Sequence, residues 1–389
     1  MKKWQKTTFL GLLMLGLFVG LMYVFKYKIV KTSSSNIDFA PEVESKEVFV
    51  PDSIQKPENI IFFIADGMGF SHLSLAMMSQ QIEGQHSVWQ NFEVKSWHDA
   101  RNTYGPLTDS GASATAMATG TTTFFDVIGQ DKDGNNKENV FEIATQNNYA
   151  TAIVTDSYVW DATPAAFVAH TKSRDNAREI LEQIAASELD LLFGELEDVG
   201  EDEVPDLETT MEILTQKFTL LDHSLELPPT TSDSKPFAAI FEEDEIQDLD
   251  SSPNLLELTK VALDVLSSKD QPFILLVECE EMDSASHAND TERLIKGLQA
   301  LQSTLDYVQD FAKEHGNTLL LFTADHETGG LAVTAESDDY PKMEIVWSTT
   351  NHTAAVVPLL AQGPGAEHFE DVHRNRHIGQ VLKTLIRTE

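Results

Sequence analysis

Cysteine is almost absent from this chain of 389 residues, in which Cys279 is the only one. A single cysteine excludes a framework of internal disulfides. A chain of this length can form its core without one, because 41% of its residues are hydrophobic. The length allows one large α/β domain or two ordinary domains, and no internal repeat is evident.

Basic residues are also scarce. The chain has 27 lysines and arginines against 63 acidic residues, a net charge of −36. Nucleic acid is therefore not expected as a partner, because a phosphate backbone needs a basic surface. Acidic residues are dense between about residues 195 and 250, where the spacing of an EF-hand with its central glycine is missing. We expect a solvated acidic insertion there rather than a calcium loop.

Long apolar runs are missing except at residues 9–25, which have three lysines on each side. As a helix this run reaches ~25 Å, just short of a hydrocarbon core. Residues 1–31 are thus predicted to be a signal peptide or signal anchor. No A-x-A cleavage site and no cysteine for a lipid follow it, which favours an uncleaved membrane anchor.

A polar tether is predicted at residues 32–56, which contain Pro41 and Pro51. The globular domain then occupies residues 57–389. Because a long domain after such a segment is translocated largely regardless of charge, we expect it on the periplasmic or extracellular side of the membrane.

Four short apolar runs alternate with longer helical patterns in this domain. They lie at residues 60–65, 151–154, 273–277 and 318–322. Such alternation predicts an α/β fold, a three-layer sandwich with a mostly parallel central sheet and helices on both faces. Ligands of such sheets bind beyond the carboxyl ends of the strands.

Polar residues follow each of these predicted strands. They are Asp66, then Thr155 and Asp156, then Glu278, and finally Asp325 and His326. After one strand, an Asp or Thr is better explained as a helix cap. After three or four strands, such residues indicate ligands that gather at one edge of the sheet.

Ser110 begins a run of small residues that is predicted to be helical through residues 112–118, with Thr108 or Asp109 as its cap. A helix N-terminus favours a bound anion and offers backbone N–H groups to phosphate oxygens. Asp283 and His287 are one helical turn apart, so both can face one metal ion. Asp, His and Ser ligands suit zinc, and all-oxygen sites suit magnesium.

Six motifs occur in a collinear order. They lie at residues 64–69, 108–116, 161–170, 277–287, 323–327 and 352–353. Through them the chain resembles the alkaline phosphatases, in the branch with a serine nucleophile, from about Asn59 to near the C-terminus. The resemblance implies the alkaline phosphatase fold and the hydrolysis of a broad range of small phosphate monoesters, with release of inorganic phosphate.

The resemblance also implies the role of each site residue and the cofactors, two Zn²⁺ and one Mg²⁺. Ser110 would be the nucleophile that becomes phosphoserine, and Arg174 would grip two phosphate oxygens as a bidentate fork. One zinc would be held by Asp283, His287 and His352, and the second by Asp66, Asp325 and His326 with Ser110. The magnesium would be held by Asp66, Thr163 and Glu278, with Asp161 holding a coordinated water.

Two features differ from the family pattern. Ser284 stands where relatives often have a basic or larger side chain, which affects support for phosphate and for the third metal. The stretch between Glu327 and His352 is short, where many relatives carry an insertion with a subunit contact. Members of the family are commonly homodimers, and this chain would then lack part of that interface.

The motifs favour this function over three alternatives. A sulfatase needs a C/S-x-P-x-R context, whereas Ser110 is followed by Gly-Ala-Ser. Phosphodiesterases of the same superfamily commonly have a threonine nucleophile and lack the Arg174 and magnesium pattern. A catalytically silent, membrane-tethered protein that binds metal or phosphate would have lost Ser110, Arg174 or a zinc ligand, and none is missing.

Overall fold

The computed structural model describes residues 56–83, 87–196, 207–227, 235–243, 245–246, 250–335 and 342–387, together with residues 14, 16, 35 and 36. The chain divides into two units, Met1–Ala40 and Pro41–Glu389. The expected anchor and tether fall almost entirely outside the described residues. Among the helices that are described, none has the length and apolar character needed to cross a membrane.

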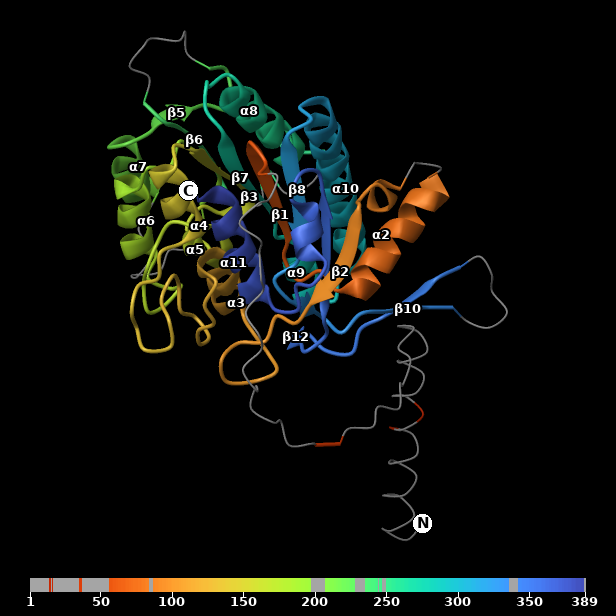
Figure 1. Ribbon diagram of the computed structural model, residues 1–389. Helices are drawn as coiled ribbons and strands as arrows, with labels where there is room; N and C mark the ends of the chain where they lie inside the picture. The colour runs from red at the N-terminus through yellow and green to blue at the C-terminus, as the bar shows by residue number, and fades with distance from the viewer. Residues whose placement is uncertain are drawn as a thin grey trace, which may run out of the picture. The chain divides into compact units, whose positions relative to one another are not determined.

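One large sheet occupies the centre of the second unit (Figure 1). Within the described residues it has nine strands in the order β2-β13-β8-β1-β7-β3-β4-β6-β5. Their bounds are β1 Asn59–Ala65, β2 Val94–His98, β3 Ala150–Tyr158, β4 Leu191–Glu195, β5 Thr219–Leu221, β6 Phe237–Phe241, β7 Phe273–Cys279, β8 Thr318–Thr323 and β13 Val357–Gln362. All neighbours from β8 to β5 are parallel, and β13 is antiparallel to both β8 and β2.

Helices cover both faces of this sheet, because the central strands are apolar on both sides. In β1, Ile60, Phe62 and Ile64 share a core with one set of helices: α3 Ser110–Thr119, α4 Val140–Gln146, α5 Ala162–Ala166, α6 Ala177–Ala186, α7 Leu207–Thr215 and α11 Asn375–Ile386. The alternate residues Ile61 and Phe63 share a second core with α2 Phe70–Glu83, α8 Leu255–Ser267, α9 Glu281–His287 and α10 Thr291–Glu314. The predicted three-layer α/β sandwich with a mostly parallel sheet is confirmed.

Two strands run further than the apolar pattern predicts. β3 continues to Tyr158 and β7 to Cys279, so Thr155, Asp156 and Glu278 lie inside strands rather than after them. Each of these strands has a parallel neighbour on both sides, and the backbone hydrogen bonds to those neighbours extend the strand through its polar residues. Thr155 and Glu278 are paired across the two strands.

The described part of the acidic segment at residues 195–250 contributes to the main fold. It contains α7 and the strands β5 and β6, and these strands extend the sheet beyond β4.

Two small ribbons lie outside the main sheet. β9 Glu327–Thr328 pairs with β12 His352–Thr353, and β10 Ala332–Thr334 pairs with β11 Glu344–Val346. Because β9 follows soon after the carboxyl end of β8, its pairing with β12 brings His352 to the edge of the sheet where the predicted ligands lie.

Candidate active site

Helix α3 places Ser110 at its first residue. The Asp109 side chain caps the helix by accepting a hydrogen bond from the Ala112 N–H at 3.1 Å, so Asp109 rather than Thr108 is the cap. Every residue of α3 is buried, and Ser110 itself is 4% exposed. Ser110, the predicted nucleophile, therefore stands at a buried helix N-terminus, where backbone N–H groups favour an anion.

One predicted ligand contacts Ser110, and two others contact that ligand. Its Oγ lies 3.2 Å from His326 Nε2, and that nitrogen lies 3.2 Å from Asp325 Oδ2 and 3.5 Å from Asp66 Oδ1. Asp66 directly follows β1, and Asp325 and His326 follow β8, the parallel neighbour of β1. The two strand ends thus bring these residues together, as the sequence predicted.

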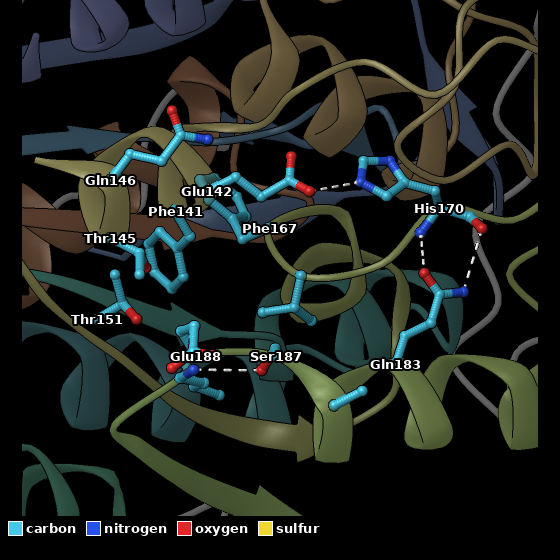
Figure 2. Close-up of a pocket in the computed structure, with 13 residues that line it drawn as sticks. Phe141, Glu142, Thr145, Gln146, Thr151, Phe167, His170, Gln183, Ser187 and Glu188 are labelled. Atoms are coloured by element: carbon cyan, nitrogen blue, oxygen red, sulfur yellow. Dashed lines mark hydrogen bonds and ion pairs between the residues drawn. The ribbon is translucent and has the colours of Figure 1, made fainter.

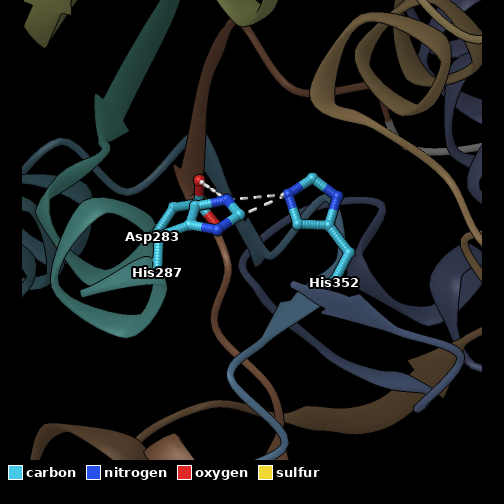
Figure 3. A group of neighbouring side chains, drawn as sticks. All are labelled: Asp283, His287 and His352. Atoms are coloured by element: carbon cyan, nitrogen blue, oxygen red, sulfur yellow. Dashed lines mark hydrogen bonds and ion pairs between the residues drawn. The ribbon is translucent and has the colours of Figure 1, made fainter. Parts of the chain in front are cut away.

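A second cluster contains Asp283, His287 and His352 (Figure 3). Both Asp283 and His287 come from α9, and His287 Nε2 lies 3.2 Å from Asp283 Oδ2 and 3.1 Å from His352 Nε2. The other ring nitrogen of each histidine donates to a backbone carbonyl, His287 Nδ1 to Thr350 at 2.7 Å and His352 Nδ1 to Thr108 at 2.8 Å. Their Nε2 atoms therefore face the cluster, where each would bind a metal ion once it is deprotonated.

Asp283 lies between the two clusters. Its ligand atoms group with those of His287 and His352, and also with those of Asp66 and His326. Asp325, predicted to share an ion with Asp66 and His326, is held by the backbone N–H groups of Gly67 and His326, at 3.2 and 2.8 Å from its Oδ1.

Among the buried side-chain oxygens without a hydrogen-bond partner in the described residues, four belong to the predicted site. They are Asp66 Oδ1, Thr163 Oγ1, Glu278 Oε1 and Asp325 Oδ2. Buried polar atoms are normally paired, so unpaired oxygens need an explanation. All four belong to predicted metal ligands, and carboxylate and hydroxyl oxygens of this kind fit divalent cations.

Burial and mutual repulsion shift the pKa values of the clustered groups. Burial, together with the charge of Asp325, raises the pKa of Asp66 well above its usual value, and burial together with the charge of Asp161 does the same for Glu278. Burial lowers the pKa of His326. Burial opposes ionisation of Asp283, but the hydrogen bond from His287 holds its pKa below the ordinary value, while that bond raises the pKa of His287 to about 9.

Arg174 lies beside the start of α3. Its Nη2 donates to Asp161 Oδ1, and its Nη1 is 3.9 Å from Asp109 Oδ2. The backbone N–H of Arg174 donates to the Asp126 carbonyl at 2.7 Å, and the Asp126 N–H donates to Asp109 Oδ2 at 3.0 Å. The loop of Arg174 is thereby tied to Asp109, which caps the helix of Ser110, and the Arg174 side chain remains 27% exposed.

The predicted magnesium ligands come from β7 and α5 and from Asp66, which follows β1. Asp161 caps α5 by accepting from the Ala162 N–H at 2.6 Å, and Thr163 is in the first turn of that helix.

Ser284, which departs from the family pattern, donates its hydroxyl to Glu280 Oε1 at 2.5 Å. Ser284 therefore bonds a carboxylate at the side of the site.

Two threonines in contact with ligands were not predicted as site residues. Thr155 Oγ1 donates to Glu278 Oε2 at 2.6 Å, and Thr328 Oγ1 donates to Asp283 Oδ1. The sequence does mark Thr155, because it is a polar residue at the end of a predicted strand. Its hydrogen-bond partner, Glu278, depends on the register of β3 against β7. Thr328 stands two residues after His326, and nothing in the sequence there indicates that its side chain bonds Asp283.

A cavity of about 440 Å³ lies away from these clusters, between α4 and α6 (Figure 2). Phe141, Phe167 and Leu189 are among its apolar lining residues, and at its side Glu142 Oε1 accepts a hydrogen bond from His170 Nε2 at 3.1 Å. None of the predicted site residues lines this cavity.

Comparison with known proteins identifies the family of the chain. The alkaline phosphatase family pattern matches residues 57–202 and 215–342, which include Ser110, Arg174 and every predicted ligand except His352. Alkaline phosphatase 4 of Bacillus subtilis (strain 168) is 24% identical over 419 residues, covering 85% of this chain and 89% of that protein. Alkaline phosphatase 3 of the same organism is 26% identical over 72% of this chain, which spans 63% of that protein.

Solved structures have the same fold. The alkaline phosphatase from the Antarctic bacterium TAB5 superimposes with a TM-score of 0.76 at 26% identity, covering 87% of this chain and 100% of that one. A mutant of the TAB5 enzyme, at 27% identity and a TM-score of 0.75, has Mg bound in its M3 site. Because the family match extends over more than half of the sequence, the chain belongs to the alkaline phosphatase family of phosphatase enzymes.

Proposed function

We propose that the chain hydrolyses phosphate monoesters through a phosphoserine intermediate on Ser110. The observation that carries the proposal is the contact of Ser110 Oγ, at the N-terminus of a buried helix, with His326 Nε2, the atom beside which Asp325 and Asp66 also lie. A catalytically silent protein would have no need to bring these groups together around a serine hydroxyl.

The residues present fit three divalent cations. Asp283, His287 and His352 would hold one zinc, and Asp66, Asp325, His326 and Ser110 the second. The all-oxygen set of Asp66, Thr163 and Glu278, with Asp161 acting through a water, would hold magnesium, and two of its oxygens, Thr163 Oγ1 and Glu278 Oε1, are unpaired. When bound, such cations neutralise the charge of the phosphoryl group and of its attacking and leaving oxygens.

The chain's own groups then orient the substrate for two displacements. The backbone N–H groups at the start of α3 and the Arg174 fork bind the phosphoryl oxygens. Ser110 Oγ forms a bond to phosphorus as the bond to the ester oxygen breaks, and the alcohol leaves with a proton. Water then attacks phosphorus, the bond to Ser110 Oγ breaks, and inorganic phosphate is released.

We infer a broad range of monoester substrates. Arg174, the N-terminus of α3 and the ligand clusters all act on the phosphoryl end of a substrate, so its organic part needs little recognition. Export, tethering through residues 9–25 and a homodimer remain predictions.

The test is an assay of the full chain after removal of metals with a chelator. Turnover of p-nitrophenyl phosphate should return as zinc and magnesium are restored and should exceed that of the bis-ester and of the sulfate. Ser110→Ala should lose activity by several orders of magnitude. The matched control is Ser303→Ala, which removes another helical serine, bonded only to the Gln299 carbonyl of α10.

Three results would contradict the proposal. Turnover without any metal or undiminished turnover in Ser110→Ala would reject the mechanism. Equal or faster turnover of the bis-ester would favour a phosphodiesterase, and no turnover with metals restored would favour a silent binding protein.

A further inference from the structure

Outside the predicted ligands themselves, Thr328 is the one residue among the described hydrogen bonds whose side chain bonds a ligand in each of the two histidine-containing clusters. Its Oγ1 donates to Asp283 Oδ1 and lies 3.2 Å from His326 Nδ1. The direct distance from His326 Nδ1 to Asp283 Oδ1 is 3.9 Å, too long for a hydrogen bond. The hydroxyl therefore joins two groups that do not bond each other.

The backbone holds Thr328 firmly in this place. Its N–H donates to the Gly67 carbonyl at 3.1 Å, next to Asp66, and its Cα is paired with that of His352 across the β9–β12 ribbon. The side chain is fully buried. Segments that carry ligands of both clusters thus meet at this one residue.

Counting hydrogens determines the tautomer of His326. Thr328 has a single hydroxyl hydrogen, and the Asp283 carboxylate can only accept one. When that hydrogen goes to Asp283, Oγ1 can only accept from His326, so His326 Nδ1 carries the ring proton. His326 Nε2 then presents its lone pair towards Ser110, Asp66 and Asp325.

The other two cluster histidines reach this arrangement by a simpler route. His287 and His352 donate Nδ1 to backbone carbonyls, which can only accept. The partner of His326 is instead a hydroxyl, which can donate or accept, and only its bond to Asp283 removes the ambiguity. His326 is therefore the one histidine of the three whose tautomer depends on a side chain.

We propose that Thr328 is a positioning residue that fixes the Nε2 lone pair of His326 and couples this ligand to Asp283 of the neighbouring cluster. The inference rests on the proposed function, because it assigns His326 and Asp283 to metal binding. Thr328 itself touches neither substrate nor the reacting atoms. Removal of its hydroxyl leaves His326 Nδ1 without its partner and frees one oxygen of Asp283.

The test compares Thr328→Val with Thr328→Ser in the full chain. Zinc affinity, measured by competition with a chromogenic chelator, should fall about 10- to 100-fold in Thr328→Val, as is typical for the loss of a partner behind a metal ligand. Thr328→Ser keeps the hydroxyl and should remain within a few fold of the wild type. Thr304→Val, at a buried threonine of α10 that bonds the Ala300 carbonyl, controls for the general cost of this substitution.

A second readout needs no metal and no activity. In ¹⁵N-histidine spectra of the chelator-treated wild type, His326 should give the signature of the Nδ1-protonated tautomer, and Thr328→Ser should retain it. A His326 protonated at Nε2 overturns the inference, and so do equal zinc affinities of the wild type and Thr328→Val, or an equal loss in Thr328→Ser. If the wild type binds no zinc, the proposed function fails, and the tautomer of His326 alone tests the role of Thr328. If Thr328→Val does not fold, the wild-type spectrum and the results for Thr328→Ser test that role.

Discussion

At the scale of single residues, the site depends on hydroxyl and carbonyl groups behind the ligands as much as on the ligands. The carbonyls of Thr350 and Thr108 orient His287 and His352, and Thr155 Oγ1 bonds one oxygen of Glu278 while the other stays unpaired. Such partners set the direction in which a ligand presents its lone pair.

Thr155 should therefore control magnesium binding but not zinc binding. In Thr155→Val, Glu278 loses the 2.6 Å hydrogen bond that orients its carboxylate, and we expect magnesium affinity to fall about 10- to 100-fold. Calorimetric titration of the chelator-treated protein with Mg²⁺ and with Zn²⁺ measures both. Thr151→Val, at a buried position earlier in the same strand, is the control; equal magnesium affinity in the two variants would refute this role.

At the scale of elements, α3 positions Ser110, the proposed nucleophile, through close packing. Its small side chains let α11 approach until Gly379 touches the backbone at the carboxyl end of α3. A Cβ added at Gly379 would lie 2.5 Å from the Met117 carbonyl oxygen and 2.6 Å from the Gly120 nitrogen. Neither backbone atom can move without moving the helix that carries Ser110 at its other end.

Gly379→Ala should accordingly destabilise the protein, by about 1–3 kcal/mol for the overpacking. Urea unfolding measures the change, and the activity that remains per folded molecule reports whether α3 has shifted. Gly105→Ala is the control, since a Cβ there meets no atom within 4 Å. If the Gly379→Ala protein is as stable as the wild type, α3 and α11 can move apart without cost, and the prediction is wrong.

At the scale of the whole molecule, the two cores bury histidines in neutral form. Burial lowers the pKa of His98 to about 4, and likewise that of His72. His98 lies at the end of β2, where its Nε2 is 2.8 Å from Thr323 Oγ1, beside the segment of Asp325 and His326. The native state resists protonation of these rings, whereas the unfolded chain does not.

Acid should therefore destabilise the fold in a defined window. With a folded pKa of about 4 and an unfolded value near 6.5, the unfolded state binds more protons between these limits, so the free energy of unfolding falls as the pH drops from 6.5 to 4. Each histidine contributes about 1.4 kcal/mol per pH unit there. His98→Asn should show a slope smaller by about that amount in urea unfolding at pH 7, 6, 5 and 4, and a slope equal to that of the wild type would contradict the assignment.

The sequence by itself determined the layers of the fold and the identity of the family. Apolar runs mark buried strands because a strand covered on both faces is apolar throughout, and the motif around Ser110 is local, so both are readable without a structure. The ends of β3 and β7 were not readable, because hydrogen bonds to neighbouring strands carry those strands through Thr155, Asp156 and Glu278.

Only the tertiary structure decided how the ligands are held. Asp283 lies between two clusters, and Thr328 bonds it and His326, because α9, the β8 end and the β9–β12 ribbon meet there. The register of β3 against β7 places Thr155 opposite Glu278. These contacts join residues far apart in the chain, and spacing within a sequence carries no information on which distant side chains share a hydrogen bond.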